Sequence, residues 1–490
     1  MKKFCARVVV FLLIATGLLL SQTSSDSERI ITEALKQSSL EANLRRLTDQ
    51  VGGRVPGTPA MRHGVEWGLA AFTAVGGKNV HTEEFTVPHS WAEGATQMRV
   101  VAPEQFTVHA ISLGWAPALS PHAQVQIVDV GQGTPDDFAK AGRIAGAVLL
   151  VHTEEMKTWE DLFAEYLNAP GIVERAVKGK ALAIAFQSTR PNDLLYRHTN
   201  AVAGEIDRVP MVLVTREDGS RMGRLLASGQ SLYADLAIPN QIGGAIKAAN
   251  VIAEIPGSEQ PDQFVLLGAH LDSWELGTGA LDNGCNAALV VDALRAIKDS
   301  GLRPRHTIRF ALFSGEEEGM LGSRAYVTVH RSELDKAVGV VIFDSGTGRT
   351  TGFSLGGRKD VAAATTSLIE PLQEFGAANV TTDAEWGTDN FDFMLEGVPT
   401  FVANQEEANY LINYHAQSDT FDKVDLTQLK KHVAEAAELT FALANAPQRV
   451  GPRLDRAAIE QTMRDTGLDK QLRVMGVWQE WERGQRGRMK

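Results

Sequence analysis

The sequence predicts an α/β fold: a mixed, mainly parallel sheet flanked by helices, with an inserted strand-rich domain. Three short apolar runs, FVLLGA (264–269), IRFALF (308–313) and VGVVIF (338–343), are typical of strands buried on both faces of a parallel sheet. Helical periodicity falls between them, at 286–298 and 320–330. This alternation indicates a doubly wound sheet, in which ligands bind outside the carboxyl ends of the strands.

Length and composition allow a large folded protein and exclude several classes. The 490 residues, 44% hydrophobic and 22% charged, are enough for about three domains of about 150 residues. A net charge of −12 disfavours a nucleic-acid or anionic-membrane partner, because such binding needs an excess of Lys and Arg. Two cysteines, Cys5 and Cys285, are too few for a disulfide framework or a cysteine-rich zinc site. Any metal must therefore be held by His, Asp and Glu.

The first 25 residues have the order of a secretory signal peptide. Basic residues precede an apolar run from Val8 to Leu20, and small polar residues 21–25 follow. The run is short for a membrane span of about 20 residues. We expect cleavage, export to the periplasm or the extracellular space, and no stable membrane span after processing; an uncleaved anchor is the alternative. Cys285 would then be a lone thiol in an oxidising compartment, which requires that it be buried.

The remaining chain divides into four parts. An amphipathic helix is expected from Ser27 to about Gln50, followed by a turn-rich loop from Gly52 to Ala60. Strand-like runs with glycine turns, which carry none of the chemistry described below, indicate a separate inserted domain. These runs are 123–131, 144–151, 181–186 and 210–214. The expected boundaries are 26–118 for the first part of the main domain, 119–240 for the inserted domain, 241–447 for the second part and 448–490 for a C-terminal helical tail.

Side chains of the metal-binding type follow each of the three buried strands. The first strand runs into His270, with Asp272 two residues later; the second runs through Ser and Gly into Glu316 and Glu317; the third runs into Asp344. We expect these side chains at the functional edge of the sheet, because ligand sites in such sheets lie at the carboxyl ends of the strands.

Two further candidates come from loops. Asp282 opens the helix that follows the first strand, where an Asp is also a normal N-cap. His415 lies in the polar loop NYHAQSDT (413–420), before a helix that Asp425 and Gln428 can start as a capping pair. Each residue alone has a structural explanation. Together they do not, because burying several unpaired carboxylates costs several kcal/mol each, and a metal pair is the simplest compensation.

Carboxylates and imidazoles without cysteine suit a pair of zinc, cobalt or manganese ions that hydrolyse a substrate. A carboxylate that bridges two ions about 3.5–4 Å apart allows a hydroxide to be held between them. A neighbouring carboxylate must still take the proton from the attacking water and return it to the leaving group. Glu316 beside Glu317 can do so, since consecutive residues that leave a strand point apart.

Four segments carry a family resemblance. They are GAHLDSWELGTGALDNG (268–284), FSGEEEGMLGSRAY (313–326), FDSG (343–346) and YHAQSDT (414–420). They resemble the zinc-dependent exopeptidase family of the bacterial leucyl aminopeptidases and glutamate carboxypeptidases. PRHTIRF (304–310) and EWGTDNFDFMLEGVP (385–399) resemble its carboxypeptidase branch. The resemblance extends from about Leu44 to about Asn445 and implies that the inserted domain is a protease-associated domain.

The resemblance also implies a set of roles. Two Zn²⁺ ions are expected, with no other cofactor. The implied ligands are His270 and Asp344 for one ion, Glu317 and His415 for the other, and Asp282 for both. Glu316 would be the general base of a metal-bridging hydroxide, and Asp272 would hydrogen-bond His270. The segment Asn283-Gly284-Cys285 departs from the family pattern, in which a second acidic or small residue often follows the bridging Asp.

The expected function is hydrolysis of dipeptides or short unblocked peptides, in the manner of a carboxypeptidase. An aminopeptidase is the main alternative, because residues 380–400 contain five acidic side chains and no Lys or Arg, and an acidic rim attracts an α-amino group. These acids are Asp383, Glu385, Asp389, Asp392 and Glu396. The five-ligand set argues against a one-zinc glutaminyl cyclase and against an inactive receptor-like binding module. A homodimer is left open.

Several other residues are expected to be structural. Glu318 is predicted to be a solvent-facing helix residue, and Cys285 a small buried filler. The glycine-rich pieces at 131–137 and 354–360 are predicted to be turns. The Trp and Arg residues of the tail are predicted to lie on a solvated helix. They are Trp478, Trp481, Arg483, Arg486 and Arg488.

Overall fold

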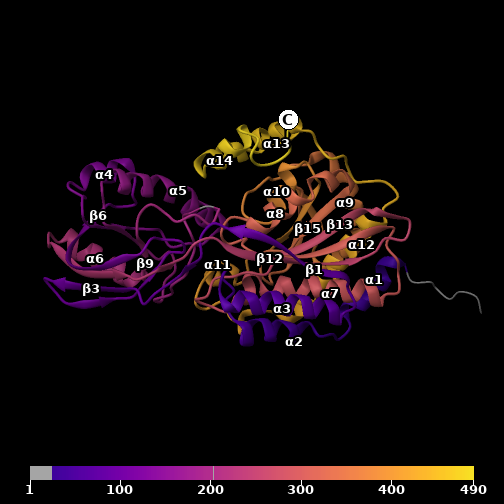
Figure 1. Cartoon of the computed structure of the whole chain (residues 1–490), viewed down its shortest axis with the longest axis horizontal. Coiled ribbons are helices and arrows are strands. Elements are labelled where there is room, and N and C mark those ends of the chain that lie inside the picture. Colours follow the sequence, from indigo (N-terminus) through magenta and orange to yellow (C-terminus); the bar gives the residue numbers. More distant parts are fainter. Residues whose placement is uncertain (1–24, 202, 490) are drawn as a thin grey trace, which may run out of the picture.

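The computed structural model describes residues 25–201 and 203–489 and shows a larger α/β part beside a smaller strand-rich part (Figure 1). The predicted signal peptide therefore lies, apart from Ser25, outside the described residues. Within the described part of the chain, no helix has the length and apolar character needed to cross a membrane.

The larger part is built on an eight-stranded mixed sheet. In spatial order its strands are β1 (Lys78–Val87), β12 (Ile246–Ile255), β14 (His306–Phe313), β13 (Gln260–His270), β15 (Ala337–Ile342), β18 (Thr400–Gln405), β16 (Thr350–Ser354) and β17 (Asn379–Thr381). The four central strands β14, β13, β15 and β18 are parallel, whereas β1, β12 and β16 pair antiparallel with neighbours. The predicted mixed α/β fold and its three buried strands are confirmed.

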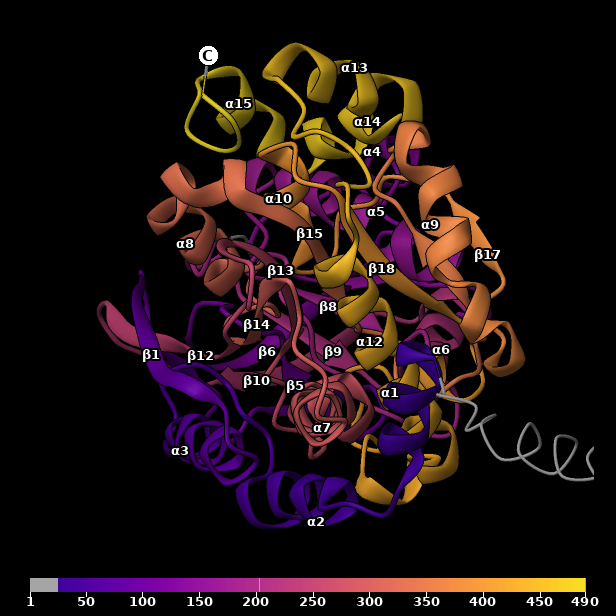
Figure 2. The same cartoon turned by 90° about the vertical axis from the view of Figure 1, so that its right-hand side faces the viewer.

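Helices cover both faces of this sheet (Figures 1 and 2). One face packs against α1 (Asp26–Leu35), α3 (Pro59–Ala74), α7 (Cys285–Asp299) and α12 (Leu426–Asn445). The other face packs against α8 (Leu321–Val329) and α10 (Asn390–Leu395). Alternate residues of β13 supply the two cores: Val265 and Leu267 face the first layer, and Leu266 faces the second. The predicted helices at 286–298 and 320–330 correspond to α7 and α8.

The smaller part contains a second eight-stranded sheet. Its order is β4 (Phe106–Val108), β3 (Gln97–Ala102), β10 (Leu232–Ile238), β6 (Leu119–Asp129), β7 (Val148–Val151), β8 (Ala183–Gln187), β9 (Met211–Val214) and β5 (Ala110–Ser112). The helices of this part are α4 (Pro135–Lys140), α5 (Trp159–Lys178) and α6 (Arg216–Ala227). The sheet takes in residues 97–112, before the expected boundary at 119, because β3 pairs with β10 and β5 pairs with β9.

The first helix differs from the prediction. The expected helix over Ser27–Gln50 is divided into α1 and α2 (Leu40–Arg45), and α2 continues into a π-helical segment over Arg46–Val51. Lys36 is extended, and Ser38 Oγ donates to Asp292 Oδ2 at 3.0 Å, so the serine-rich stretch bonds elsewhere in place of continuing the helix. The loop after it ends at Thr58, which caps α3 by accepting from the Met61 N–H.

The prediction of a solvated tail helix is wrong for Trp478, Trp481 and Arg486, whereas Arg483 is exposed as expected. Residues 456–482 form three short helices, α13 (Arg456–Thr466), α14 (Leu468–Val474) and α15 (Val477–Glu482). Trp478 and Trp481 are each 1% exposed and join an apolar cluster with α10. Arg486 is also buried and makes two bonds to the Asp392 carboxylate, at 2.8 and 2.7 Å. Residue type alone suggested solvent exposure, whereas the apolar face of the tail needs a partner surface.

Candidate metal centre

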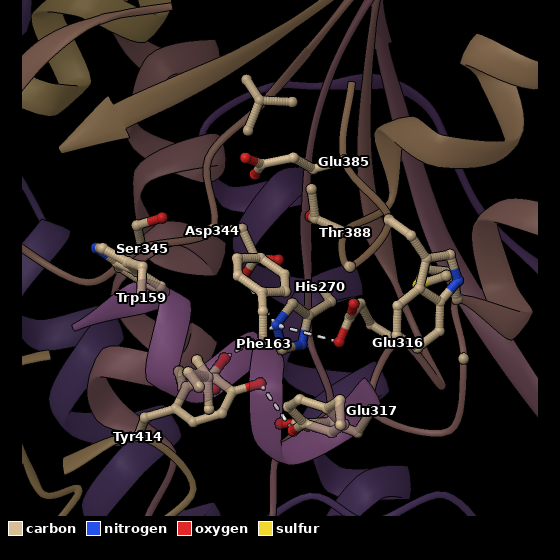
Figure 3. Close-up of a pocket in the computed structure, with 18 of the residues that line it drawn as sticks. Trp159, Phe163, His270, Glu316, Glu317, Asp344, Ser345, Glu385, Thr388 and Tyr414 are labelled. Carbon is tan, nitrogen blue, oxygen red and sulfur yellow. Dashed lines mark hydrogen bonds and ion pairs between the residues drawn. The ribbon is translucent and has the colours of Figure 1, made fainter. Parts of the chain in front are cut away.

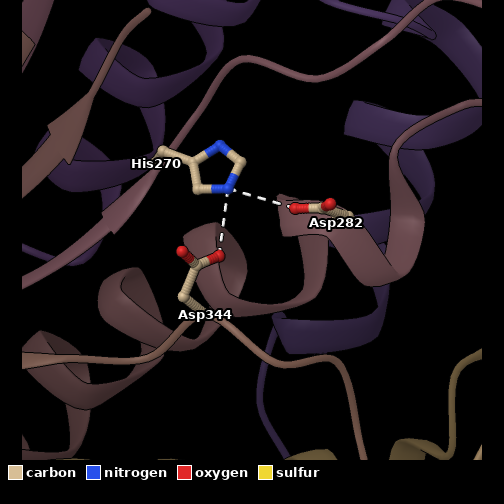
Figure 4. A group of neighbouring side chains, drawn as sticks. All are labelled: His270, Asp282 and Asp344. Carbon is tan, nitrogen blue, oxygen red and sulfur yellow. Dashed lines mark hydrogen bonds and ion pairs between the residues drawn. The ribbon is translucent and has the colours of Figure 1, made fainter. Parts of the chain in front are cut away.

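Two groups of metal-type side chains meet at the carboxyl edge of the main sheet. His270 Nε2 lies 3.1 Å from Asp282 Oδ1 and 3.0 Å from Asp344 Oδ1 (Figure 4). His415 Nε2 lies 3.2 Å from Asp282 Oδ2 and 2.8 Å from Glu317 Oε2. Asp282 therefore belongs to both groups, one carboxylate oxygen facing each. The structure brings all five predicted ligands together.

The parallel strands deliver three of these side chains. His270 is the last residue of β13, and Asp344 follows the end of β15 by two residues. Glu317 follows β14 after Gly315, whose φ of +74° favours glycine and turns the chain away from the strand. Because β14, β13 and β15 are parallel neighbours, their carboxyl ends place the three side chains at one edge.

His415 and Asp282 come from loops with unusual backbones. His415 has a φ of +59°, a conformation that costs a non-glycine residue about 1–3 kcal/mol. Asp282 has non-helical angles, φ −122° and ψ 94°, and its peptide bond to Asn283 is cis. Gly284, not Asp282, occupies the N-cap position of α7, so the capping explanation of Asp282 does not hold.

Two residues that sequence reasoning missed hold the loop that presents Asp282. Asp419 accepts the backbone N–H groups of residues 280, 281 and 282 at 3.1, 2.7 and 3.1 Å. Arg54, fully buried, donates to the carbonyls of Leu271, Thr278 and Gly279 at 2.5–2.9 Å. Arg54 lies in the Gly- and Pro-rich loop and Asp419 in the YHAQSDT segment. In neither case does the surrounding sequence predict the hydrogen-bond partners of the residue.

Asp272 contacts both sides of the centre. Its backbone carbonyl lies 3.1 Å from His270 Nδ1 and its carboxylate Oδ1 3.5 Å from the same nitrogen. Its Oδ2 accepts the backbone N–H of Glu317 at 3.2 Å. The predicted contact between Asp272 and His270 is therefore made mainly through the backbone, while the carboxylate also fixes the segment that carries Glu317.

Glu316 stands beside the ligands, not among them. Its Oε2 is 4.0 Å from His270 Nε2, and its side chain is 11% exposed and lines a cavity. Burial raises the pKa of Glu316 well above its ordinary value, and repulsion from Asp344 and Glu317 adds to this, against the opposing effect of His270.

The pKa values at the centre are shifted because several acidic side chains are buried close together. Burial, with repulsion from Asp282, raises the pKa of Glu317 to about 7. Burial opposes protonation of His415, yet Glu317 and Asp282 outweigh it and raise its pKa to about 9. Among the described residues, Asp282 Oδ2 and Glu317 Oε1 are buried and have no hydrogen-bond partner, although His415 Nε2 lies 3.2 Å from Asp282 Oδ2. Acceptor atoms left in this state, together with an imidazole for each group, fit bound divalent cations.

Glu318 contradicts its prediction. It is 1% exposed, and neither carboxylate oxygen has a hydrogen-bond partner among the described residues. Burial raises its pKa well above the ordinary value, and repulsion from Asp272 and Glu317 adds to this. The predicted solvent-facing helix starts only at Leu321, so Glu318 sits in the turn before it and points inward.

The acidic rim predicted over residues 380–400 is mostly not a rim. Asp389 is fully buried, and Asp392 is paired with Arg486. Glu396 is fully buried and paired with Arg331 and Arg453. Only Asp383 and Glu385 are exposed, and Glu385 alone of the five lines the cavity. Their arginine partners come from residues 331, 453 and 486, outside the segment from which the rim was inferred.

A cavity of about 410 Å³ lies over the centre (Figure 3). The smaller part of the molecule contributes Trp159, Phe163 and Tyr166 of α5 to its lining. Tyr414 stacks on His415 with a centroid distance of 3.6 Å, and its hydroxyl lies 3.1 Å from that of Tyr166. An apolar and aromatic wall thus faces the polar cluster. Cys285 is buried and its Sγ bonds to Leu281 O at 3.3 Å, as expected of a filler.

Comparisons with known proteins show which proteins this chain is similar to. Residues 250–440 match Peptidase family M28. Carboxypeptidase Q of Mus musculus is 28% identical over 404 residues, 81% of this chain and 84% of the relative. The crystal structure of a peptidase M28 precursor from Shewanella amazonensis is 25% identical with a TM-score of 0.80, covering 88% of this chain and all of that one.

The fold is shared by an aminopeptidase from Aneurinibacillus sp. strain AM-1. That structure is 20% identical with a TM-score of 0.64, and the match covers 88% of this chain and 98% of that one. The resemblance found in the sequence is confirmed by these matches. The residues gathered at the sheet edge lie within the matched region, residues 250–440. Over residues 250–440, this chain is therefore similar to the zinc-dependent exopeptidases of peptidase family M28.

Proposed function

We propose that this enzyme is a co-catalytic dizinc exopeptidase that hydrolyses dipeptides or short unblocked peptides, as a carboxypeptidase Q-like enzyme would. One observation carries the proposal. The Asp282 carboxylate is shared by two ligand groups, each with one imidazole and one further carboxylate. A shared carboxylate is what a pair of catalytic ions requires, and one ion would need only one of the two groups.

His270 and Asp344 would hold one ion, Glu317 and His415 the other, and Asp282 both. When bound, the two zinc ions would acidify a water molecule and polarise the scissile carbonyl. Asp272 would fix His270 through its carbonyl and Glu317 through its carboxylate, which sets the geometry of both groups.

Glu316 would act as the general base. Its side chain reaches the cavity next to both groups without being part of either. It would accept the proton of the attacking water and then donate it to the leaving amine, so that the amide bond breaks and a carboxylic acid and an amine form. A carboxyl whose pKa is raised by burial can hold this proton between the two steps.

The substitution Glu316→Gln tests this proposal. We expect kcat for an unblocked dipeptide to fall about 10²- to 10⁴-fold, because the amide cannot accept the proton. Zinc content should stay at two ions per chain, since Glu316 is not a ligand. Glu406→Gln, an exposed residue outside the cavity lining, is the matched control and should keep wild-type kcat. Wild-type turnover in Glu316→Gln would refute the assignment.

An aminopeptidase remains a second candidate, favoured by Glu385. It is an exposed acid that lines the cavity, where it could attract an α-amino group. Dipeptides blocked at one end separate the two candidates. A carboxypeptidase hydrolyses amino-blocked dipeptides and rejects carboxy-blocked ones, and an aminopeptidase does the reverse. Only the first pattern supports the carboxypeptidase assignment.

Two further parts of the proposal concern the rest of the chain. We propose that the strand-rich part is a protease-associated domain, which the family resemblance supports. We also propose that the protein is exported, on the order of basic, apolar and small polar residues in its first 25 positions. Amino-terminal sequencing of the protein from periplasmic or secreted fractions should then start near residue 26.

A further inference from the structure

The C-terminal tail takes part in the wall of the cavity. Gln471 and Met475, at α14 and immediately after it, line the cavity and are half-buried. The helix α14 also contacts α5, which supplies Trp159 and Phe163 to the same cavity. Figure 1 shows α14 above the junction of the larger and smaller parts and α13 above the larger part. The tail thus connects two sides of the site.

The tail is docked firmly enough to act as a wall. Arg486 and Asp392 form a bidentate pair with both side chains buried, at 2.8 and 2.7 Å. Trp478 and Trp481 are buried in an apolar cluster whose other members include Met320, with Trp386 packed against it. Met320 and Trp386 themselves line the cavity. The tail therefore supports the wall from behind as well as contributing to it.

The cavity is small for a long peptide substrate. Its volume of about 410 Å³ is near the lower end of the range for small-molecule sites, about 300–1,000 Å³. An extended peptide advances about 3.3–3.6 Å per residue, so a hexapeptide of about 20 Å needs a path out of the site. The helices α14 and α5 contact each other beside the cavity, and both contribute residues to its lining.

We propose that the C-terminal tail sets an upper limit on substrate length, with Gln471 and Met475 as the specificity-determining residues. This inference rests on the proposed peptidase function and names the substrate class of that site: peptides of two or three residues. Gln471 and Met475 exclude longer chains by occupying the space that further residues would enter. The tail lies outside residues 250–440, the stretch that matches the family model.

The experiment compares unblocked oligo-alanines of two, three, four and six residues as substrates of the zinc-loaded full chain. The double variant Gln471→Ala/Met475→Ala enlarges the cavity beside the tail, and Met475→Trp makes it smaller. The double variant Val474→Ala/Gln479→Ala is the matched control, because both residues are exposed on the same tail and neither lines the cavity. Melting temperature and zinc content verify folding, and the single variant Met475→Ala replaces the double one if that fails to fold.

We expect wild-type kcat/KM to fall at least tenfold from dialanine to hexa-alanine. In Gln471→Ala/Met475→Ala, the ratio of kcat/KM for hexa-alanine to that for dialanine should rise at least threefold. In Met475→Trp, kcat/KM for tri- and tetra-alanine relative to dialanine should fall. The control variant should show the wild-type ratios. Equal wild-type kcat/KM across the series, or the wild-type ratio in Gln471→Ala/Met475→Ala, would overturn the tail's role alone. Absence of hydrolysis at every length would instead contradict the proposed function.

Discussion

At the scale of single residues, the candidate centre depends on side chains outside its two groups of possible ligands. The loop that carries Asp282 is held by three N–H groups donated to one carboxylate, Asp419. Burial raises the pKa of Asp419 to about 7, although the hydrogen bond from the Leu281 N–H opposes this. Arg54 fixes the carbonyls on the other side of the loop. Together they set the position of the Asp282 carboxylate, which the two groups share.

Asp419→Asn should therefore weaken zinc binding. The amide group would turn an N–H donor toward one of the backbone N–H groups that the carboxylate now accepts, which loosens the Asp282 loop. We expect zinc affinity to fall about 10- to 100-fold, measured by competition with a chelating dye. Asp422→Asn, three residues later and exposed, is the control. Unchanged zinc affinity in Asp419→Asn would show that the loop holds its shape unaided.

Sequence reasoning predicts ligands better than it predicts their supports. His270, Glu317 and Asp344 follow buried strands, so the shared edge of a parallel sheet predicts that they converge. Glu318 shows the limit of the method, because its inward direction depends on a turn that ends only at Leu321. Arg54 is separated from its partners by more than 200 residues, and no local pattern encodes such a contact.

At the scale of elements, α12 combines a structural and an electrostatic role. It packs under the sheet and carries Glu435, which is fully buried and accepts from the Thr350 hydroxyl at 2.5 Å. Burial raises the pKa of Glu435 to about 8, and the Thr350 hydrogen bond opposes this only in part. The helix α12 therefore carries a buried carboxyl group, that of Glu435, which keeps its proton in the folded protein at neutral pH.

Glu435→Gln should change the pH dependence of stability. Folded Glu435 keeps its proton up to about pH 8, whereas the unfolded chain releases it near pH 4.5, so the free energy of unfolding falls as pH rises between these values. The free energy of unfolding of the variant should equal that of the wild type near pH 4.5 and exceed it by about 3 kcal/mol at pH 7. Thermal melts between pH 4.5 and 8.5, with exposed Glu374→Gln as control, measure this. Parallel profiles for the variant and the wild type would contradict it.

Element types follow from periodicity more readily than element ends and surroundings. The three apolar runs predict β13, β14 and β15. Asp425 caps α12 by accepting from the backbone N–H groups of Thr427 and Gln428, whereas the Asp425 N–H donates to Thr347 and not to Gln428, so only one half of the predicted capping pair forms. The tail differs because Trp and Arg are equally suited to a solvated helix and to an interface. Only the surface presented by α10 decides between these environments.

At the scale of the whole molecule, the site is assembled from three distant regions. The sheet edge supplies the polar cluster, α5 of the smaller part supplies aromatic side chains, and the tail supplies Gln471 and Met475. The expected boundary at residue 119 misses β3, β4 and β5, since pairing between strands that are far apart in the sequence leaves no periodic signal. For the same reason, the sequence does not predict that α5 and the tail enclose the site.

Removal of zinc should destabilise the whole fold. Without cations, the buried carboxylates of the centre repel one another, whereas bound ions stabilise only the folded chain. Free zinc at about 1,000 times its Kd contributes about 4 kcal/mol per site. We expect the melting temperature to fall by several degrees after chelation and to recover when zinc is restored, measured by calorimetry at constant pH. Equal melting temperatures with and without zinc would contradict this.

The most direct test of the paired centre is a crystal structure of the zinc-loaded enzyme with an anomalous difference map at the zinc absorption edge. We predict two peaks. One should lie among His270, Asp282 and Asp344, and the other among Asp282, Glu317 and His415. A single peak, or peaks that leave Asp282 in contact with only one ion, would contradict it.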